Sequence, residues 1–202
     1  MAAEAIYVRI VIRAPIERVW ELTQSPELHS RWDLRFSSIR PTGKLASGGY
    51  RFAYERRMPL HTIRGTGTSL GERQRPDGTR TSALRFDTDD RLSALGAGRG
   101  YWRYEPQSDG STVCITGYDY VPNWGILDRL GVRRLVGWMT AWSFDRLRIW
   151  AETGVEPERW SPLSVLAVWD RGRPRAVRCS RHAPGRDSMA AAPATLSTLE
   201  AP

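Results

Sequence analysis

The sequence contains little cysteine and no long apolar run. Its 202 residues include only two cysteines, Cys114 and Cys179, too few for a disulfide scaffold and too far apart for a common zinc motif. We therefore expect a reducing, cytoplasmic setting and no metal site. No apolar stretch approaches the roughly 18 residues of a membrane helix, and the start of the chain lacks the regions of a signal peptide. The sequence thus predicts no stable membrane insertion.

Lysine is almost absent, although the chain is basic. Lys44 is its only lysine, yet lysine and arginine together number 30 against 22 acidic residues, for a net charge of +8. The arginines are scattered among acidic residues rather than gathered in a run. Scattered basic charge is typical of a solvated surface, whereas a nucleic-acid interface concentrates it in a patch. We therefore predict no nucleic-acid partner.

Residues for acid–base or nucleophilic catalysis are also scarce, with only three histidines. We expect His29 at the surface or in local packing, and His61 in a hairpin bend. His182 has Cys179 three residues before it, which is at most half a metal site. The glycine-rich stretch 95–100 lacks the lysine and the strand–helix setting of a phosphate-binding loop. We predict no catalytic residue and no cofactor.

Aromatic residues are abundant, with nine tryptophans and seven tyrosines, and the elements follow a clear order. Residues 5–13 alternate apolar and polar, which predicts a half-buried strand. Two short helices are expected next, at 16–23 and 26–32, the second with proline at its start. Residues 34–121 predict an antiparallel meander with glycine-containing turns. Residues 126–152 have the period of a long helix.

The long helix has two contrasting sectors on a helical projection. One broad sector holds Leu135, Val136, Met139, Trp142, Leu147 and Trp150. The other holds Gly137, Ala141, Asp145, Arg148 and Glu152. A single sheet with an apolar concave face needs a cover, and this helix is the only element large enough. We therefore predict an α+β fold in which a curved antiparallel sheet grips one long C-terminal helix around an apolar space.

Two stretches of the sequence resemble a known superfamily. The opening AIYVRIVIRAPIERVWELTQSPELHSRW has the order strand, Ala14-Pro15, Val19-Trp20, Ser25-Pro26-Glu27 and Trp32. The later stretches WRYEPQSDGSTVCITGYDY and GWMTAWSFDRLRIWAE extend the likeness, which covers about residues 5–152. Together they resemble the START-like (SRPBCC) superfamily of polyketide cyclase, lipid-transport and Bet v 1-like helix-grip proteins. The resemblance implies a deep hydrophobic cavity with an entrance between loops and the long helix.

Candidate ligand-binding residues come from the late strands and the facing helix, where aromatic side chains either fill a core or line a pocket. They are Tyr54, Arg56, Trp102, Tyr104, Tyr118, Trp138, Met139, Trp142, Ser143 and Arg146. Arg146 lies in the apolar sector of the helix and needs a partner there. Its charge is met by a carboxylate such as Glu55 or Glu105, by snorkelling to the edge of the helix, or by an oxygen of the ligand.

The sequence divides into a START-like ligand-binding domain, residues 1–153, and a tail, residues 154–202, rich in proline and arginine. We expect the tail to be largely disordered, so that deletion after residue 156 leaves Tm nearly unchanged. The predicted function is binding, with or without transport, of a lipid, polyketide or aromatic metabolite. The alternative is a polyketide aromatase/cyclase using the same cavity, and a third hypothesis is an interaction module using the tail.

Overall fold

The fold is built from a strand meander, two short helices and one long helix. The computed structural model describes residues 5–46, 48–185, 187–200 and 202. The strands are β1 (Ile6–Ile12), β2 (Ser38–Lys44), β3 (Tyr50–Met58), β4 (His61–Gln74), β5 (Arg80–Asp87), β6 (Leu95–Pro106) and β7 (Thr112–Pro122). The helices are α1 (Ile16–Gln24), α2 (Pro26–Trp32), α3 (Arg133–Thr153) and α4 (Thr195–Thr198), with single turns η1 (Asp128–Val132), η2 (Pro157–Arg159), η3 (Pro162–Leu166) and η4 (Ala176–Arg178).

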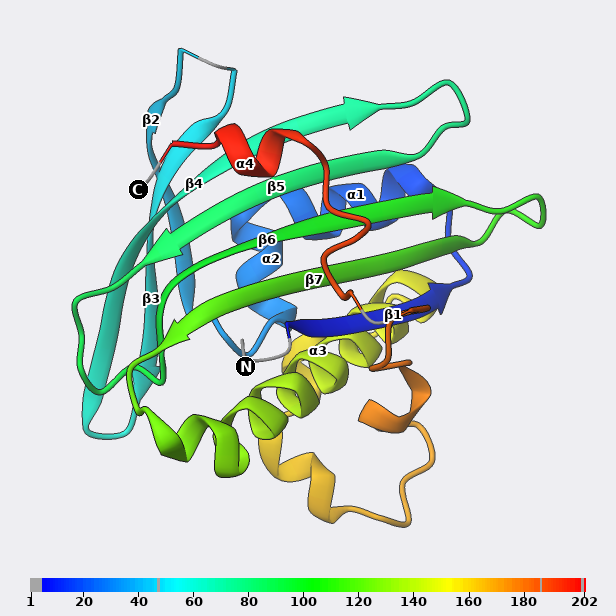
Figure 1. Cartoon of the computed structure of the whole chain (residues 1–202). Coiled ribbons are helices and arrows are strands. Elements are labelled where there is room, and N and C mark those ends of the chain that lie inside the picture. The colour runs from blue at the N-terminus through cyan, green and yellow to red at the C-terminus, as the bar shows by residue number, and fades with distance from the viewer. Residues whose placement is uncertain (1–4, 47, 186, 201) are drawn as a thin grey trace.

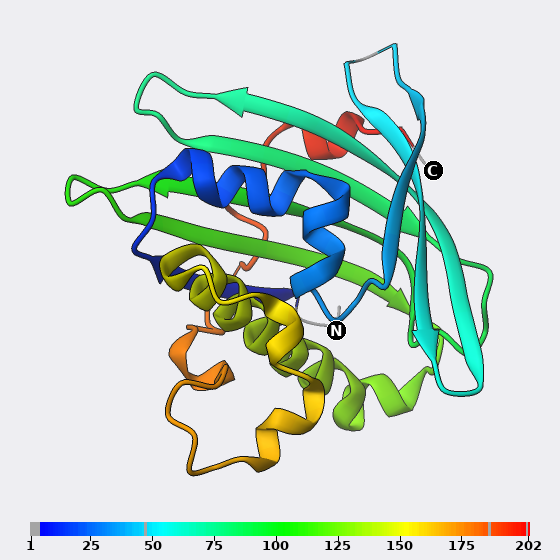
Figure 2. The ribbon, with the colours of Figure 1, turned by 180° about the vertical axis from the view of Figure 1, so that it is seen from behind.

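The strands of the described chain form one antiparallel sheet in the order β1-β7-β6-β5-β4-β3-β2. Strands β2 to β7 each pair with their sequence neighbours, as short turns require, whereas β1 pairs with the last strand, placing Ile6 opposite Tyr118. The sheet bends strongly, with α3 lying along β1 at its edge (Figure 1). From behind, α1, α2 and α3 all cover the concave face (Figure 2). This arrangement confirms the predicted helix-grip fold.

Glycines on β4 allow large rings to lie flat across the concave face. Phe52 is opposite Gly67 in the β3–β4 register, and Tyr54 is opposite Gly65. A Cβ atom on Gly67 would lie 2.3 Å from the Phe52 ring, and one on Gly65 would lie 2.3 Å from the Tyr54 ring. Any side chain at these positions would therefore push the rings away from the sheet.

Helix α3 starts later than the sequence predicted and is buried on more of its surface. Residues 128–132, which include Gly131, form the π-helical turn η1, and the α-helix begins at Arg133. Ala141 and Asp145, in the sector opposite the large apolar side chains, are fully buried. Leu135 in the apolar sector is 55% exposed. The amphipathic projection therefore misjudged these positions, because it could not include a cover on the outer side of the helix.

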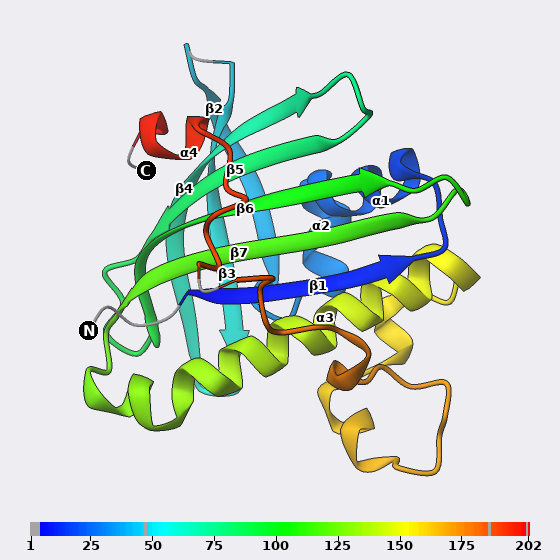
Figure 3. The same ribbon diagram turned by 45° about the vertical axis from the view of Figure 1, so that its right-hand side comes forward.

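That cover comes from the segment after residue 153. The Cys179 thiol donates to the Ala141 carbonyl over 3.1 Å, and the Arg175 amide donates to the Asp145 carboxylate over 2.7 Å. Further along, Ser180 forms an antiparallel bridge with Arg9 of β1. The same segment then crosses the outer face of the sheet to reach α4 (Figure 3). There the Tyr101 hydroxyl donates to the Ser188 carbonyl over 3.1 Å.

The packed segment changes the burial of the strands beneath it. Tyr7 and Tyr101 face outward from the sheet, yet they are 5% and 0% exposed because Met189 and neighbouring alanines cover them. Composition predicted a largely disordered tail, whereas the structure gives residues 154–185 and 187–200 defined contacts with the domain. The strength of those contacts in solution, and with it the domain boundary at residue 153, stays a prediction that truncation tests.

Candidate functional site

A cavity of about 450 Å³ lies between the concave face of the sheet, α2 and the start of α3. Most of its wall is apolar and aromatic, including Phe36, Phe52, Leu84, Phe86 and Trp102. The cavity opens where lining residues also reach the surface, and these are Met58, Leu92, Trp124 and Leu135. Its mouth therefore lies between the β3–β4 turn, the β5–β6 connection and the approach to α3.

The opposite end of the cavity is closed by hydrogen bonds among α1 and β6. The Tyr104 hydroxyl donates to Thr23 Oγ1 over 2.7 Å and accepts from Gln24 Nε2 over 2.8 Å. Thr23 in turn donates to the Val19 carbonyl over 2.8 Å. Burial raises the pKa of Tyr104 well above its ordinary value, so this hydroxyl stays protonated. These groups satisfy one another and close the wall.

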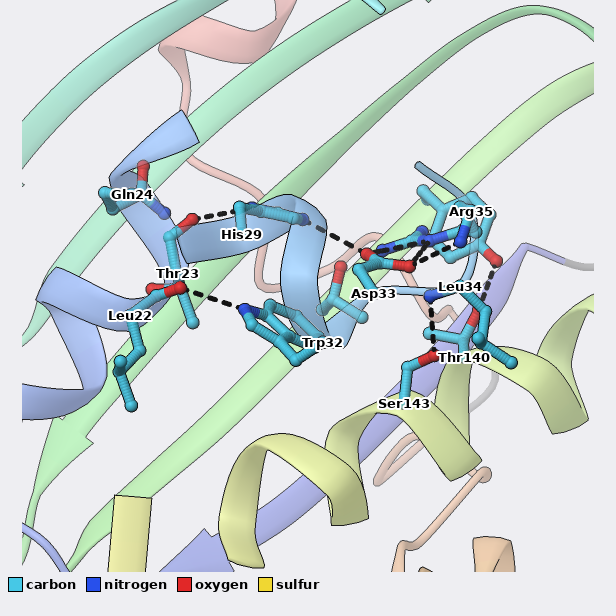
Figure 4. Close-up of polar contacts among 12 residues, drawn as sticks. Leu22, Thr23, Gln24, His29, Trp32, Asp33, Leu34, Arg35, Thr140 and Ser143 are labelled. Atoms are coloured by element: carbon cyan, nitrogen blue, oxygen red, sulfur yellow. Dashed lines mark hydrogen bonds and ion pairs between the residues drawn. The ribbon is translucent and has the colours of Figure 1, made fainter. Parts of the chain in front are cut away.

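A polar cluster of His29, Asp33, Arg35, Tyr118 and Thr140 interrupts the apolar wall (Figure 4). Its geometry starts at α2, where His29 and Asp33 are four residues apart. His29 Nδ1 lies 2.6 Å from the Thr23 carbonyl, and Nε2 lies 3.1 Å from Asp33 Oδ2. A carbonyl and a carboxylate both accept only, so the ring is held between two acceptors, one at each nitrogen.

Asp33 carries the negative charge of this cluster. Its side chain is fully buried, and Arg35 grips it through Nε and through Nη2 at 2.6 Å. Burial by itself would raise the pKa of this carboxyl, but the charge of Arg35 and the hydrogen bond from His29 outweigh it and hold the pKa well below its usual range. Burial would likewise lower the pKa of Arg35, yet the charge of Asp33 raises it overall. Asp33 and Arg35 therefore form a charged pair, in which Arg35 lines the cavity and Asp33 lies behind it.

Tyr118 completes the cluster from β7. The Arg35 guanidinium lies 4.9 Å from the centre of the Tyr118 ring. The Thr140 hydroxyl donates to the Val136 carbonyl over 2.9 Å, so at the 2.7 Å contact between the two hydroxyls Tyr118 is the donor. Burial raises the pKa of Tyr118 despite the nearby Arg35. The phenol proton is therefore held within the protein rather than offered to a ligand.

Arg56 differs from every charged group of the polar cluster. It lines the cavity from β3 and is half-buried, and its guanidinium makes no hydrogen bond or ion pair with any residue that the structure describes. Burial lowers its pKa, and the more distant charge of Asp33 only partly opposes that effect. Tyr54, two residues earlier, donates to the Asp87 carbonyl over 3.3 Å. Arg56 is thus a cation at the cavity wall without a close counter-charge among the described residues.

Half of the sequence-predicted site residues lie on the cavity wall. These are Tyr54, Arg56, Trp102, Tyr118 and Met139. The others do not line the cavity: Tyr104 belongs to the closed end, Trp142 is core, and Trp138 is partly buried against that core. Ser143 Oγ accepts the Leu34 amide over 3.1 Å, which links α3 to the segment that follows α2.

Arg146 lies elsewhere than the helical projection indicated. Its Nε donates to the Pro157 carbonyl over 2.8 Å, and Nη1 lies 3.5 Å from the Trp32 carbonyl. Neither Glu55 nor Glu105 pairs with it. Burial lowers its pKa to about 10. Arg146 therefore ties α3 to α2 and to the segment after residue 153.

Sequence reasoning missed His29 and Arg35 as residues of the cavity wall. His29 was expected at the surface or in local packing, but it is 9% exposed and lines the cavity. The i, i+4 spacing of His29 and Asp33 was a signal for their contact. Nothing in the sequence indicated that the extended residues after α2 return Arg35 to that pair. The same reasoning found no acid–base pair, and the structure adds a His29–Asp33 contact inside the wall.

The described residues contain no group of three or more histidine, cysteine or acidic side chains placed to hold a metal ion. Within the same part of the chain, every helix is too short or too polar to cross a bilayer.

The combination of a curved sheet, a gripped helix and an internal cavity can now be compared with known proteins. A family model described as polyketide cyclase / dehydrase and lipid transport matches residues 4–149. The chain belongs to this family. Membership confirms the START-like, SRPBCC-type resemblance seen in the sequence. The match ends at residue 149, so the segment after that residue lies outside the matched region.

One curated relative extends beyond that region. The chain is 37% identical over 174 residues to the "Uncharacterized membrane protein YndG" of Bacillus subtilis (strain 168), a match that covers 84% of this chain and 65% of the relative. The chain therefore spans less than two thirds of that relative's length.

Solved structures share the fold at low sequence identity. TTHA0849 from Thermus thermophilus has a TM-score of 0.53 and 17% identity, and the match covers 71% of this chain and 94% of that one. The ZhuI aromatase/cyclase from Streptomyces sp. R1128 has a TM-score of 0.53 and 12% identity, over 76% of this chain and 98% of that one. These matches support the helix-grip architecture and no particular activity.

Proposed function

We propose that this protein binds a hydrophobic small molecule with an acidic or strongly accepting oxygen group in its internal cavity. A lipid, a polyketide or an aromatic metabolite has this chemistry. The observation that carries the proposal is Arg56, a half-buried guanidinium on an otherwise apolar wall, with no hydrogen bond or ion pair to the described residues. An unpaired buried cation is costly, and a ligand carboxylate or carbonyl would supply its partner.

The polar cluster supports binding over catalysis. Both nitrogens of His29 are engaged by Thr23 and Asp33, and the Tyr118 proton is donated to Thr140. A general acid or base must reach the substrate with a free proton or lone pair. These groups already use theirs within the protein, so they serve to hold Arg35 and the wall in place.

The first test is binding of decanoate and decanol, two ligands with the same tail and different head groups. We expect saturable binding of both, with decanoate bound more tightly by the wild-type protein. Arg56→Met should weaken decanoate binding by about 1.5–3 kcal/mol, the value of a lost charge-assisted hydrogen bond, and leave decanol binding nearly unchanged. Isothermal titration calorimetry measures both affinities.

Arg57→Met is the matched control, because Arg57 is exposed on the same strand and pairs with Glu55. It should bind both ligands as the wild type does. Equal decanoate affinity in wild type and Arg56→Met would contradict the anchoring role. Absence of binding to either ligand, together with no co-purified ligand in native mass spectrometry, would contradict the binding function itself.

The alternative is a polyketide aromatase/cyclase. It is favoured by two guanidinium groups, Arg35 and Arg56, on one cavity wall, since such groups polarise carbonyls. Incubation of the protein with a linear poly-β-ketone thioester tests it. A cyclised aromatic product that is lost in Arg56→Met would favour the enzyme, whereas retention of the linear compound in a stable complex would favour the binder.

We propose that ligand binding takes place in the cytoplasm. Both cysteines are free and buried, as expected where thiols stay reduced. The Bacillus subtilis relative is named a membrane protein, and its name supports a position near a membrane. Labelling of the native protein in intact cells by a membrane-impermeant reagent would contradict this location.

A further inference from the structure

Residues 160–178 form a lobe outside the domain matched by the family model. In all three views the lobe projects beyond α3, away from the sheet (Figures 1 to 3). Its base is fixed, because Trp160 and Ala176 are 8% and 5% exposed and pack in the main core. Asp145 also receives the Arg175 amide over 2.7 Å and the Arg178 guanidinium over 2.8 Å. The lobe is therefore anchored at both ends.

The tip of the lobe is apolar and faces solvent. Its side chains are Leu163, Leu166, Val168 and Trp169, exposed by 73%, 69%, 67% and 80%, with Val177 nearby at 84%. Single exposed apolar residues are ordinary, but several on one small projection indicate an interaction site. A tryptophan this exposed is unusual in particular, since it is a residue that folding normally covers.

The charge around this tip is strongly positive. Between residues 159 and 181 the sequence has six arginines and a single acidic residue, Asp170. Arg178 is committed to Asp145, whereas Arg159 and Arg171 have exposed side chains. An apolar tip bordered by arginines complements an anionic lipid surface, where tryptophan and leucine enter the interface and arginine meets the phosphates.

The lobe, the β3–β4 turn and η1 all lie toward the lower end of the molecule in the three views, with the lobe on the opposite side from the turn (Figures 1 to 3). Exposed apolar side chains also occur near the cavity mouth at Leu60, Ile126 and Leu130, which are 100%, 71% and 70% exposed. A broad surface that receives the tip would therefore lie toward the same end of the molecule as the opening of the cavity.

We propose that the tip of this lobe docks the protein reversibly on an anionic phospholipid bilayer. A bilayer fits the observations better than a second copy of the chain, because a standard protein interface buries about 800 Å² on each partner, whereas a shallow membrane contact needs only a few inserted side chains. Net charge favours the same choice, since two copies each carrying +8 repel one another.

The test is flotation of the full chain with phosphatidylcholine vesicles, with and without phosphatidylglycerol. We expect the wild type to float with the anionic vesicles and less so at high salt. The triple variant Leu166→Ser/Val168→Ser/Trp169→Ser should bind at least about tenfold more weakly. Val11→Ser removes an apolar side chain that is 44% exposed on β1, so this control should bind as the wild type does.

A second measurement locates the tip directly. Bromine-labelled lipid should quench part of the tryptophan emission of the wild type, and Trp169→Phe should keep vesicle binding but lose most of that quenching. Wild type that stays unbound to anionic vesicles, or a triple variant that binds equally well, would overturn the proposal. The proposal would also be overturned if Ile126→Ser/Leu130→Ser lost vesicle binding while the triple variant kept it. A dimer seen by sedimentation would overturn it as well, if the triple variant abolished the dimer and the wild type did not bind vesicles.

Discussion

At the scale of single residues, two arginine side chains, those of Arg56 and Arg146, have different roles in this protein. Arg56 and Arg146 were both candidate ligand-binding residues, and a partner within the protein was the alternative for Arg146. Arg146 finds its partners in the backbone, at the Pro157 and Trp32 carbonyls, whereas Arg56 reaches the cavity wall with no close partner among the described residues. Both guanidinium groups are charged, so the two residues differ only in whether a hydrogen-bond acceptor of the protein lies nearby.

The charge of the buried Asp33 carboxylate can be tested through the pH dependence of stability. Its pKa lies below the usual range in the folded protein, so its contribution to stability is present above the unfolded pKa of about 4 and is lost as pH falls below it. Asp33→Asn should lower the free energy of unfolding near neutral pH by about 3–5 kcal/mol, because Arg35 loses its buried counter-charge. The variant should also lack this acid-dependent loss.

Urea unfolding at several pH values between neutral and acid checks both statements. Asp89→Asn is the control, because Asp89 is exposed, and it should follow the wild-type curve. Parallel pH profiles for the wild type and Asp33→Asn would mean that Asp33 does not carry this charge.

At the scale of secondary-structure elements, cross-strand pairs set the shape of the cavity. Phe52 and Tyr54 lie over Gly67 and Gly65, their partners across the β3–β4 ladder. The rings can lie flat only because the facing residues have no side chain. Strand order alone would give a curved sheet, but these pairs determine how much space remains above it.

Gly67→Ala tests this pairing. The new Cβ atom would meet the Phe52 ring at 2.3 Å and the Arg85 carbonyl at 2.7 Å, so we expect a loss of about 1–3 kcal/mol in the free energy of unfolding. Gly43→Ala is the control, since no atom lies within 4 Å of its Cβ position. It should change stability little or raise it by about 0.4–1 kcal/mol. Equal stability of the two variants would contradict the steric role of Gly67.

At the scale of the whole molecule, the segment after residue 153 buries side chains of α3 and of the sheet that face away from the cavity. It covers Ala141 and Asp145 on α3 and the outward-facing Tyr7 and Tyr101 of the sheet. Its composition, interrupted by proline and rich in arginine, gave no sign of this. The anchors are isolated residues rather than a periodic pattern, so amphipathic analysis does not detect them.

Truncation after residue 156 measures how strongly the segment is held. Composition predicted an almost unchanged Tm. The contacts in the structure instead predict a drop of more than about 8 °C, since several apolar side chains and the Asp145 carboxylate lose their cover. A chain ending at residue 182 keeps the Asp145 contacts and should lose less. Calorimetry compares the three proteins, and an unchanged Tm in the shorter chain would show that the segment is not stably docked.

The sequence by itself determined the order of elements, the helix-grip fold and the apolar nature of the cavity. Alternation in β1, proline at the start of α2 and turn residues between strands are local signals, and local signals depend only on neighbouring residues. Tyr54, Arg56, Trp102, Tyr118 and Met139 were found because strand and helix periods place them on inward faces. Only the tertiary structure placed the Arg35–Asp33 pair beside Tyr118, turned Arg146 toward Pro157, and laid residues 187–200 over the outer face of the sheet. Those contacts join residues far apart in sequence or in irregular segments, where no period exists to predict which side chains meet.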